Sequence, residues 1–539
     1  MSLTPLLTLN AAETSPALLF AGQGSPWQET VAAAGASPQA EQLTGLLAQV
    51  RVSAGPVARA IASTCPGVFE RLESLLNNPE ATSAEAAAAD KPGAPAAEAV
   101  DADAFPAYSV PGIVLGQIAA VGQLRDLGLN VDKAQTAGHS QGLLGEAAVD
   151  NPQDALLLAV LMGTAAAQVH GAHDTRSHML SIRGLDRAQV DKHLAGSAAV
   201  AVVNGRRHVV IAGTPEDLAA TQTAITTAAA AFNERLESRE FGGDELAPVF
   251  DYLPVALPFH HASLAGAVER TVEFAGLCGI DEDFARTLAQ QILVDEHDWS
   301  ATVAALDADY LLSLDKGLTK LTQPLAAGTG VAIVDATTAA ARNALATPGT
   351  ALPEGTDYSE FAPRLVRLPD GGVYTQTRFS AATGLSPIML GGMTPTSADA
   401  DIVAAAANAG HWTELAGGGM YSDEVFTEHR KNLEAQLKPG RTAQFNTMFF
   451  DRFLWNLQFG QARIVPKARA AGAPFNGVCV SAGIPEVDEA TALLDQLHAD
   501  GFPFVSFKPG TARQILDTLK IAAANPDSVI LMQVEDGHA

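Results

Sequence analysis

The chain has 539 residues, 47% of them hydrophobic and 17% charged, with a formal net charge of −27 at pH 7. This composition is typical of a globular protein of several domains, and the acidity argues against nucleic acid and anionic membranes as partners. Three well-separated cysteines exclude a disulfide framework and indicate a reducing cytoplasm. No run of about 18 apolar residues occurs, so we expect no membrane span.

The first third of the chain alternates predicted strands and helices. Residues 16–20 are apolar and run into AGQGSPW, which predicts a strand followed by a glycine-rich loop. Residues 110–130 have the pattern of a helix, and the short segment 131–140 predicts a buried strand that leads into a helix at 141–149. The Ala-, Pro- and acid-rich residues 77–104 predict a flexible surface insertion.

The order of the elements changes between residues 177 and 257. The pattern predicts strand, helix, strand, strand, helix and strand, and the second helix opens with a Thr-x-x-Asp cap at Thr214. The last strand is expected at 251–257. This βαββαβ order predicts a ferredoxin-like subdomain inserted in the first domain.

Residues 380–539 contain six short predicted strands, most of them followed by helix-like stretches. Repeated βα units are typical of a parallel barrel or a doubly wound sheet, and six are fewer than the eight that close a TIM barrel. The Pro- and Gly-rich residues 346–363 predict a linker, which we extend to 346–379. We therefore expect an α/β fold with domains at 1–345 and 380–539.

The segment TAGHSQGLLGEAA places Ser140 in the pattern G-x-S-x-G. In a nucleophile elbow this serine lies on a sharp turn between a strand and a helix, where glycines let the backbone pass close to its neighbours. The predicted strand and helix on either side supply that context. We therefore interpret Ser140 as a nucleophile, with an ordinary serine between two glycines as the alternative.

A serine hydroxyl needs a base to take its proton, and VALPFHHASL offers His260 at a predicted strand end. His261 is the rival, and strand alternation is expected to point the two rings to opposite faces. The charge of a tetrahedral intermediate needs N–H donors, for which the elbow predicts the Gln141 amide and the AGQGSPW loop the Gln23 amide. A structural histidine and a plain glycine turn are the alternatives.

Four motifs, LLFAGQGSPW, GHSQGLLGE, VVNGRRHVVIAG and LPFHHASL, occur here in the order found in acyl-CoA:acyl carrier protein acyltransferases. With Gln after the serine, the chain resembles the acetyltransferase domain of actinobacterial and fungal type I fatty acid synthases. The resemblance implies an α/β-hydrolase-like core, a Ser140–His260 dyad, and an oxyanion hole of the Gln23 and Gln141 amides. It also implies that a backbone carbonyl orients the base. Because SLDKGLTK, with Asp315, replaces a Gly-Pro-Gly common in relatives, the orienting group stays open.

The resemblance implies a ping-pong cycle in which Ser140 takes the acetyl group from acetyl-CoA and the phosphopantetheine thiol of an acyl carrier protein removes it. Malonyl-specific relatives carry an arginine after the elbow, whereas no Arg or Lys occurs from Gln141 to Thr175. Met162 stands near that position, and we expect Met162 and Asn204 in the acyl pocket. The alternatives are a malonyl or palmitoyl transferase, a serine thioesterase or hydrolase, and an inert docking module.

From SPIMLGGMTPT onward the chain resembles the start of the flavin-dependent enoyl reductase domain of those synthases and, more distantly, nitronate monooxygenases. The resemblance implies FMN and NADPH as cofactors. The residues it implies for the FMN pocket follow predicted strands, where barrel sites gather: Gly391, Gly392, Met393, Asn446 and Lys508. A packed glycine turn, a capping Asn and a surface Lys are the alternatives, and we expect no metal site.

In that family further βα units follow the point that corresponds to Ala539. We therefore expect an incomplete reductase domain that does not retain FMN in this chain. The resemblance also implies a cytoplasmic protein whose partners are the other synthase domains, and a homo-oligomer in the full-length protein.

Overall fold

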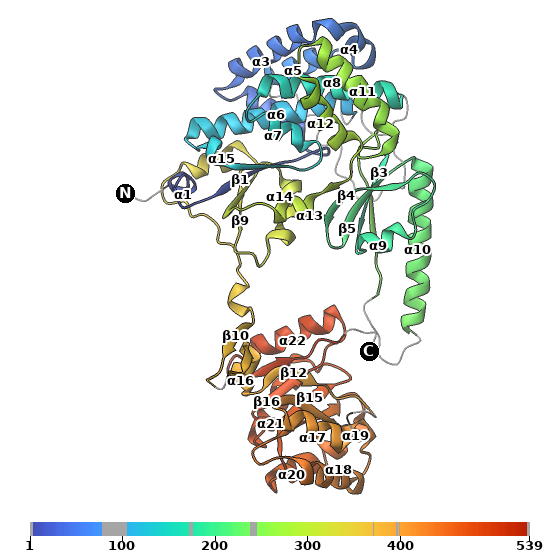
Figure 1. Ribbon diagram of the computed structural model, residues 1–539, viewed down its shortest axis with the longest axis vertical. Helices are drawn as coiled ribbons and strands as arrows, with labels where there is room; N and C mark the ends of the chain where they lie inside the picture. The colour runs from blue at the N-terminus through green and yellow to red at the C-terminus, as the bar shows by residue number, and fades with distance from the viewer. Residues whose placement is uncertain are drawn as a thin grey trace. The chain divides into compact units, whose positions relative to one another are not determined.

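The computed structural model describes residues 4–77, 105–171, 176–237, 245–369, 371–394, 397 and 399–535. The predicted insertion at 77–104 lies outside the described residues except for Asn77. The chain divides into two compact units, shown in Figure 1. Unit 1 contains Met1–Ala230 and Leu246–Ser359, and unit 2 contains Ala231–Glu245 and Glu360–Ala539. The division after Ser359 falls inside the segment predicted as a linker.

The centre of unit 1 is a four-stranded parallel sheet in the order β2-β1-β8-β9. Its strands are β1 (Pro16–Phe20), β2 (Gln135–Gly138), β8 (Tyr310–Ser313) and β9 (Ala332–Asp335). Every residue of β1 is buried, as expected for a parallel strand covered on both faces. Both strands predicted in this region are confirmed, although β2 begins later because residues 131–133 form a 3₁₀ turn.

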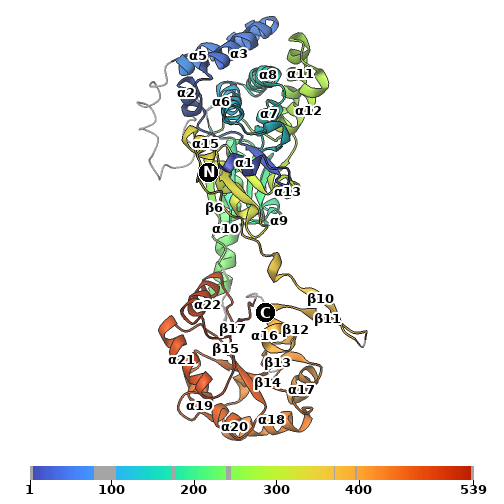
Figure 2. The same cartoon turned by 90° about the vertical axis from the view of Figure 1, so that its left-hand side faces the viewer.

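Helices cover both faces of this sheet. Leu18 and Phe20 of β1 pack with α1, α6 and α15, whereas Ala17 and Leu19 face α13 and α14. Figure 2 shows the helical layer above the sheet. The helices of this unit outside the inserted subdomain are α1 (Pro5–Leu9), α2 (Trp27–Gly35), α3 (Ala40–Ser53), α4 (Ala58–Thr64), α5 (Val68–Asn77), α6 (Pro106–Leu127), α7 (Gly142–Ala147), α8 (Pro152–His170), α11 (Ala265–Leu277), α12 (Glu282–Leu293), α13 (Trp299–Ala304), α14 (Lys316–Ala326) and α15 (Ala339–Leu345).

Helix α6 is long and apolar enough to cross a membrane by length and composition alone, with a mean hydropathy of 1.3 over its most apolar 18 residues. In the fold, 78% of that stretch is buried inside the protein. Its neighbour α8 is buried along most of its length as well. A helix that is apolar all round and packed on every side is typical of the core of a large globular domain.

The βαββαβ order predicted between residues 177 and 257 is observed. Its elements are β3 (Met179–Arg183), α9 (Arg187–Asp191), β4 (Ala199–Gly205), β5 (His208–Ala212), α10 (Pro215–Glu237) and β6 (Val249–Tyr252). The strands form an antiparallel sheet in the order β6-β3-β5-β4, to which β7 (His297–Asp298) adds in parallel beside β4. The last strand was predicted at 251–257, which is wrong: it ends at Tyr252, because Pro254 has no N–H for a ladder.

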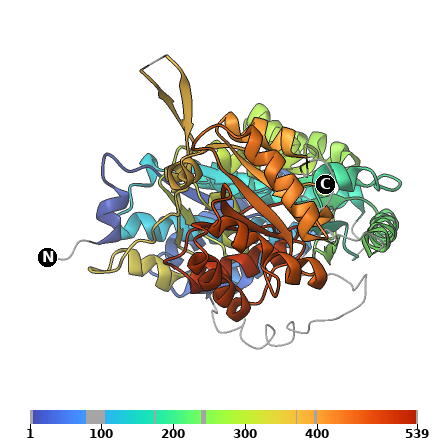
Figure 3. The same ribbon diagram turned by 90° about the horizontal axis from the view of Figure 1, so that it is seen from below.

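Unit 2 contains a six-stranded parallel sheet whose strands follow chain order. All six predicted strands are present: β12 (Ser386–Leu390), β13 (His411–Ala416), β14 (Ala443–Met448), β15 (Phe475–Ser481), β16 (Phe504–Phe507) and β17 (Ile530–Met532). Their helices are α16 (Arg378–Thr383), α17 (Ala400–Asn408), α18 (Asp423–Gln436), α19 (Arg452–Gln458), α20 (Ile464–Ala470), α21 (Val487–Ala499) and α22 (Ala512–Ala524), seen from below in Figure 3. In the described part of the chain, β12 and β17 are the edges of the sheet.

The segment predicted as a linker contains an antiparallel hairpin of β10 (Arg364–Arg367) and β11 (Val373–Gln376). The sequence between the strands, LPDGG, has the residues that favour tight turns. Leu368 and Gly372 close the hairpin through a backbone hydrogen bond of 2.8 Å. The described residues of this segment therefore include regular structure that the sequence did not predict.

Candidate active site

Ser140 lies on a sharp turn between β2 and α7, which is the strand–turn–helix context that the sequence predicted. Its φ is 55°, in the left-handed region that few residues other than glycine adopt. A Cβ on Gly138 would lie 2.3 Å from the Leu143 nitrogen, and one on Gly142 would lie 2.1 Å from the Phe20 carbonyl oxygen. Both flanking glycines are therefore required by close backbone packing.

The structure brings Ser140 and His260 together, with 2.7 Å between Oγ and Nε2. On its other side, His260 Nδ1 lies 2.7 Å from the backbone carbonyl oxygen of Asp295. A carbonyl only accepts, so Nδ1 carries the proton and Nε2 is left to accept from the serine hydroxyl. Asp315 instead caps α14 through the Leu318 N–H at 2.9 Å. The orienting group that the sequence left open is the Asp295 carbonyl.

The sequence predicted His260 at the end of a strand, which is wrong. His260 lies in a turn, where its φ is 59°. The His261 ring points elsewhere: its Nε2 donates to the Ser197 carbonyl at 2.7 Å, and its Nδ1 accepts from Ser263. The two rings diverge because of this turn geometry rather than strand alternation. Burial lowers the pKa of His260 to about 4, so the imidazole is neutral at pH 7, as a base must be.

The glycine-rich loop after β1 packs directly on the elbow. A Cβ on Gly22 would lie 2.8 Å from the His139 carbonyl oxygen. The Gln23 side chain donates to Gln141 Oε1 at 2.7 Å, and Gln141 in turn donates to the Val110 carbonyl at 3.1 Å. No described residue accepts a hydrogen bond from the backbone N–H of Gln23 or Gln141. Both amides predicted for the oxyanion hole are therefore free to donate.

Three aromatic rings, of His139, His297 and Trp299, pack beside the dyad, and sequence reasoning did not predict this group. His139 packs edge-on against His297 and Trp299, with ring centroids 5.4 and 5.3 Å away, and His297 lies 6.0 Å from His260. Burial lowers the pKa of His139, and it lowers the pKa of His297 to about 3. The rings are therefore neutral at pH 7 and add no charge beside the base.

Two further predicted residues, Met162 and Asn204, have different surroundings. Asn204 Oδ1 lies 2.8 Å from His139 Nε2, so Asn204 contacts the elbow directly. Met162 is fully buried in α8, within the largest apolar core of unit 1. Their roles in an acyl pocket stay predictions.

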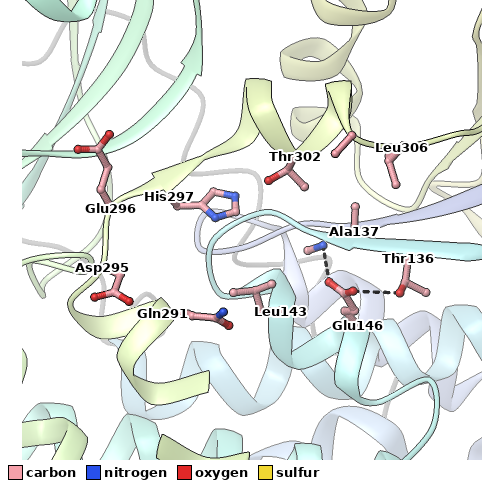
Figure 4. Close-up of a pocket in the computed structure, with 12 residues that line it drawn as sticks. Thr136, Ala137, Leu143, Glu146, Gln291, Asp295, Glu296, His297, Thr302 and Leu306 are labelled. Carbon is pink, nitrogen blue, oxygen red and sulfur yellow. Dashed lines mark hydrogen bonds between the residues drawn. The ribbon is translucent and has the colours of Figure 1, made fainter. Parts of the chain in front are cut away.

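A cavity of about 490 Å³ lies next to the elbow, where Gly138 and Leu143 line it together with Asp295. Figure 4 shows side chains that line this cavity. Three carboxylates line it, from Glu146, Asp295 and Glu296. Glu146 accepts hydrogen bonds from the Gly138 N–H at 2.9 Å and the Thr136 hydroxyl at 3.0 Å, so it binds two donors of the edge strand β2. The acidic lining disfavours an anion such as the phosphates of a CoA thioester in this cavity.

The residues predicted for a flavin pocket gather where the strands of unit 2 end. Lys508, after β16, donates to the Gly392 carbonyl oxygen at 3.1 Å and is buried, which excludes the surface-lysine alternative. A Cβ on Gly392 would lie 2.5 Å from Asn446 Cγ, whereas one on Gly391 would meet only Lys508 Nζ, at 3.9 Å. Gly391 therefore leaves open space over its backbone, and Met393 beside it is half exposed.

Glu414 of β13 is a site residue that sequence reasoning missed. Its carboxylate is fully buried and accepts from the Gly392 N–H at 2.7 Å, Asn446 Nδ2 at 2.9 Å and Trp412 Nε1 at 3.2 Å. It joins two predicted pocket residues in one polar network. An acidic residue inside the apolar run HWTELA was the signal, because a buried carboxylate needs several donors.

Comparison with known proteins finds that residues 175–252 match the family model described as the fatty acid synthase central AT domain. The fatty acid synthase beta subunit aflB of Emericella nidulans is 27% identical over 468 residues, covering 75% of this chain and 22% of that protein. The fatty acid synthase subunit beta of Saccharomyces cerevisiae is 26% identical over 408 residues, covering 67% of this chain and 20% of that protein.

The chain thus resembles the beta subunits of fungal fatty acid synthases, as its motifs indicated, and spans 22% or less of the length of those two relatives. Among solved structures, the malonyl CoA-acyl carrier protein transacylase of Coxiella burnetii aligns with a TM-score of 0.45 at 16% identity. That alignment covers 63% of this chain and 98% of the transacylase.

Proposed function

We propose that unit 1 is an acyltransferase of a fatty acid synthase that moves an acyl group from CoA to the phosphopantetheine thiol of an acyl carrier protein. The observation that carries this proposal is the relay from Ser140 through His260 to the Asp295 carbonyl. The similarity to fatty acid synthase beta subunits supports it. We assign unit 1 an α/β-hydrolase-like core with an inserted ferredoxin-like subdomain.

The relay performs the same proton transfer in both halves of a ping-pong cycle. His260 takes the proton of Ser140 as Oγ attacks the thioester carbonyl, and gives it to the departing CoA sulfur. In the second half His260 takes the proton of the carrier thiol, which attacks the acyl-serine, and returns it to Oγ. The amides of Gln23 and Gln141 donate to the oxyanion each time. Both steps balance without a further reactant.

We further propose that the acyl group is acetyl rather than malonyl. The stretch that follows the elbow, from Gln141 to Thr175, contains no Arg or Lys. Met162, which stands near the position of the arginine in malonyl-specific relatives, is apolar and fully buried in α8. A malonyl carboxylate would therefore lose water without gaining a cation, at a cost of several kcal/mol.

A preference of at least about a hundredfold in kcat/KM for acetyl-CoA over malonyl-CoA is expected, because each 1.4 kcal/mol corresponds to about a tenfold difference. The measurement follows release of CoA with a pantetheine thiol as acceptor, and a parallel reaction without thiol reports hydrolysis. Comparable values for the two substrates would contradict the acetyl assignment. Equal rates with and without the thiol would instead identify a hydrolase.

We also propose that unit 2 is part of an enoyl reductase barrel that binds FMN and uses NADPH. The open backbone at Gly391, the buried cation of Lys508 and the polar network of Glu414 and Asn446 fit a planar, polar ring system at the strand ends. Bound there, FMN would relay a hydride from the nicotinamide to an enoyl thioester. The residues of this chain would hold its ring and exclude water.

Lys508→Met in the full-length protein is expected to weaken FMN binding about tenfold or more, because it removes the buried cation that holds the Gly392 carbonyl. Quenching of FMN fluorescence on titration measures the affinity, and thermal unfolding checks the fold. Lys431→Met on α18, where the lysine is exposed, is the matched control. FMN affinity that is equal in Lys508→Met and the control would show that Lys508 does not contact the cofactor.

A further inference from the structure

The chain neighbours of the nucleophile and the base are both tied to β4 of the inserted subdomain or to the residues leading into it. We propose that these contacts position the dyad, and that His261 and Asn204 are positioning residues that keep Ser140 and His260 within hydrogen-bond distance. This inference rests on the proposed acyl transfer and adds a role for the inserted subdomain in it.

On the side of the base, the link is the ring of His261. Its Nε2 donates to the carbonyl of Ser197, just before β4, at 2.7 Å. Its Nδ1 accepts from the Ser263 N–H at 3.2 Å. Both ring nitrogens are engaged and the side chain is 8% exposed, so the orientation of the ring is fixed. The backbone that carries it, and with it His260, is therefore tied to the start of β4.

On the side of the nucleophile, the link is His139, the residue before Ser140. Its Nε2 lies 2.8 Å from Oδ1 of Asn204, near the end of β4, and Asn204 is buried. The edge-on contacts of the His139 ring with His297 and Trp299 leave it little freedom to turn away. The elbow is therefore tied to the other end of the same strand.

The group that orients the base is tied to β4 as well. Strand β7 pairs in parallel with β4 through His297 beside Val202, and Asp298 beside Val203. Asp295, whose carbonyl accepts from His260, comes directly before this pairing. Three segments that are distant in the sequence thus meet on one strand.

The dyad needs such support because its backbone is strained. Ser140 and His260 have φ values of 55° and 59°, a region that residues with a Cβ adopt only where their surroundings impose it. The two residues are 120 positions apart in the chain. Fixing each of them against one short strand sets their separation, which a displacement of about 1 Å would disrupt.

The test is His261→Ala, which removes the link on the side of the base but leaves the side chains of Ser140 and His260 chemically unchanged. We expect kcat for acyl transfer to fall about ten- to a hundredfold with KM for acetyl-CoA unchanged, as for misplaced reacting groups. His261→Gln offers an N–H donor and a carbonyl acceptor, and should restore most of the rate. His193→Ala, which changes a histidine after α9 in the same subdomain, is the matched control.

The acid limb of the pH–rate profile is a second measurement, because its midpoint reports the pKa of His260. A residue that only stabilises the fold would leave that midpoint unchanged. The charged or titratable groups around His260 are His139, His297 and Asp295. With the link lost, water reaches the imidazole, and the midpoint should rise from about 4 towards the ordinary histidine value of about 6.5. The same shift is expected in Asn204→Ala, which loosens the side of the nucleophile.

Two results would overturn the inference. In the first, the wild type forms the acyl-enzyme, but both His261→Ala and Asn204→Ala keep the wild-type kcat and acid limb. This result would overturn the positioning role and leave the proposed function standing. In the second, the wild type forms no acyl-enzyme. This result would overturn both the proposed function and the positioning role. A fall in kcat that His261→Gln restores, with His193→Ala unaffected, would support it.

Discussion

Ser140→Ala is expected to abolish formation of the acyl-enzyme while leaving the fold intact. Oγ of Ser140 is the atom to which the acyl group bonds, and no other described hydroxyl is bound to His260. Alanine has the Cβ that serine already places at this left-handed φ, so the elbow loses an oxygen without new strain. Intact mass spectrometry after mixing with acetyl-CoA measures the adduct, and thermal unfolding checks the fold.

Cysteines are the competing sites that this experiment must separate. Cys65 and Cys479 are buried, and burial raises the pKa of both thiols, so neither offers much thiolate at pH 7. Hydroxylamine at neutral pH cleaves thioesters much faster than oxygen esters, which distinguishes an acyl-cysteine from an acyl-serine. An adduct of unchanged yield in Ser140→Ala would show that the nucleophile has been assigned to the wrong residue.

The elbow was predictable from the sequence because its determinants are local. A buried strand, two glycines and a helix lie within a dozen residues around Ser140, and the close contacts of Gly138 and Gly142 are what the pattern encodes. The carbonyl of Asp295 was not predictable, because every residue has a carbonyl and its position depends on how α12 ends beside β7. A motif formed by consecutive residues can be recognised in a sequence. A backbone carbonyl that a distant segment contributes to the site cannot, because it has no characteristic residue type.

The turn at His260 shows a second limit. The apolar run before it was interpreted as a strand, but Pro254 and Pro258 interrupt any ladder, and the positive φ of His260 is imposed by tertiary contacts. The backbone N–H groups of His260 and His261 donate to Ile292 and Leu293 at the end of α12. The identity of the base was open to sequence reasoning, but its geometry depended on Ile292 at the end of a helix, 32 positions further along the chain.

In unit 2, too, features set by local sequence were predictable and features set by tertiary contacts were not. Its six strands were readable from short apolar runs between turn residues, because each buried parallel strand is a local signal. The position of Glu414 inside an apolar run was a signal that a buried polar group is present, but its partners could not be read from the sequence. Its donors, Gly392, Asn446 and Trp412, are brought to it only by the fold. Buried polar networks are specified by contacts across strands rather than by spacing along one of them.

His260→Ala is expected to slow acylation of Ser140 by about 10²–10⁴-fold, the range typical for loss of a general base. Without Nε2 the hydroxyl, 2.7 Å away in the wild type, has no described acceptor for its proton. Attack must then wait for hydroxide or water, so the residual rate should rise with pH instead of levelling off above the pKa of about 4. Stopped-flow release of CoA across pH 5–9 measures both effects.

The comparison with His261→Ala decides which histidine is the base. His261 uses both ring nitrogens elsewhere, on the Ser197 carbonyl and on Ser263, so its loss can only displace the dyad. Its effect should therefore be smaller than that of His260→Ala and should keep the plateau of the pH–rate profile, because the base is still present. Two results would show that His260 is not the base: a larger fall in rate in His261→Ala than in His260→Ala, or a pH–rate plateau that persists in His260→Ala. Either result would contradict the relay from Ser140 through His260 to the Asp295 carbonyl, on which the proposed function depends.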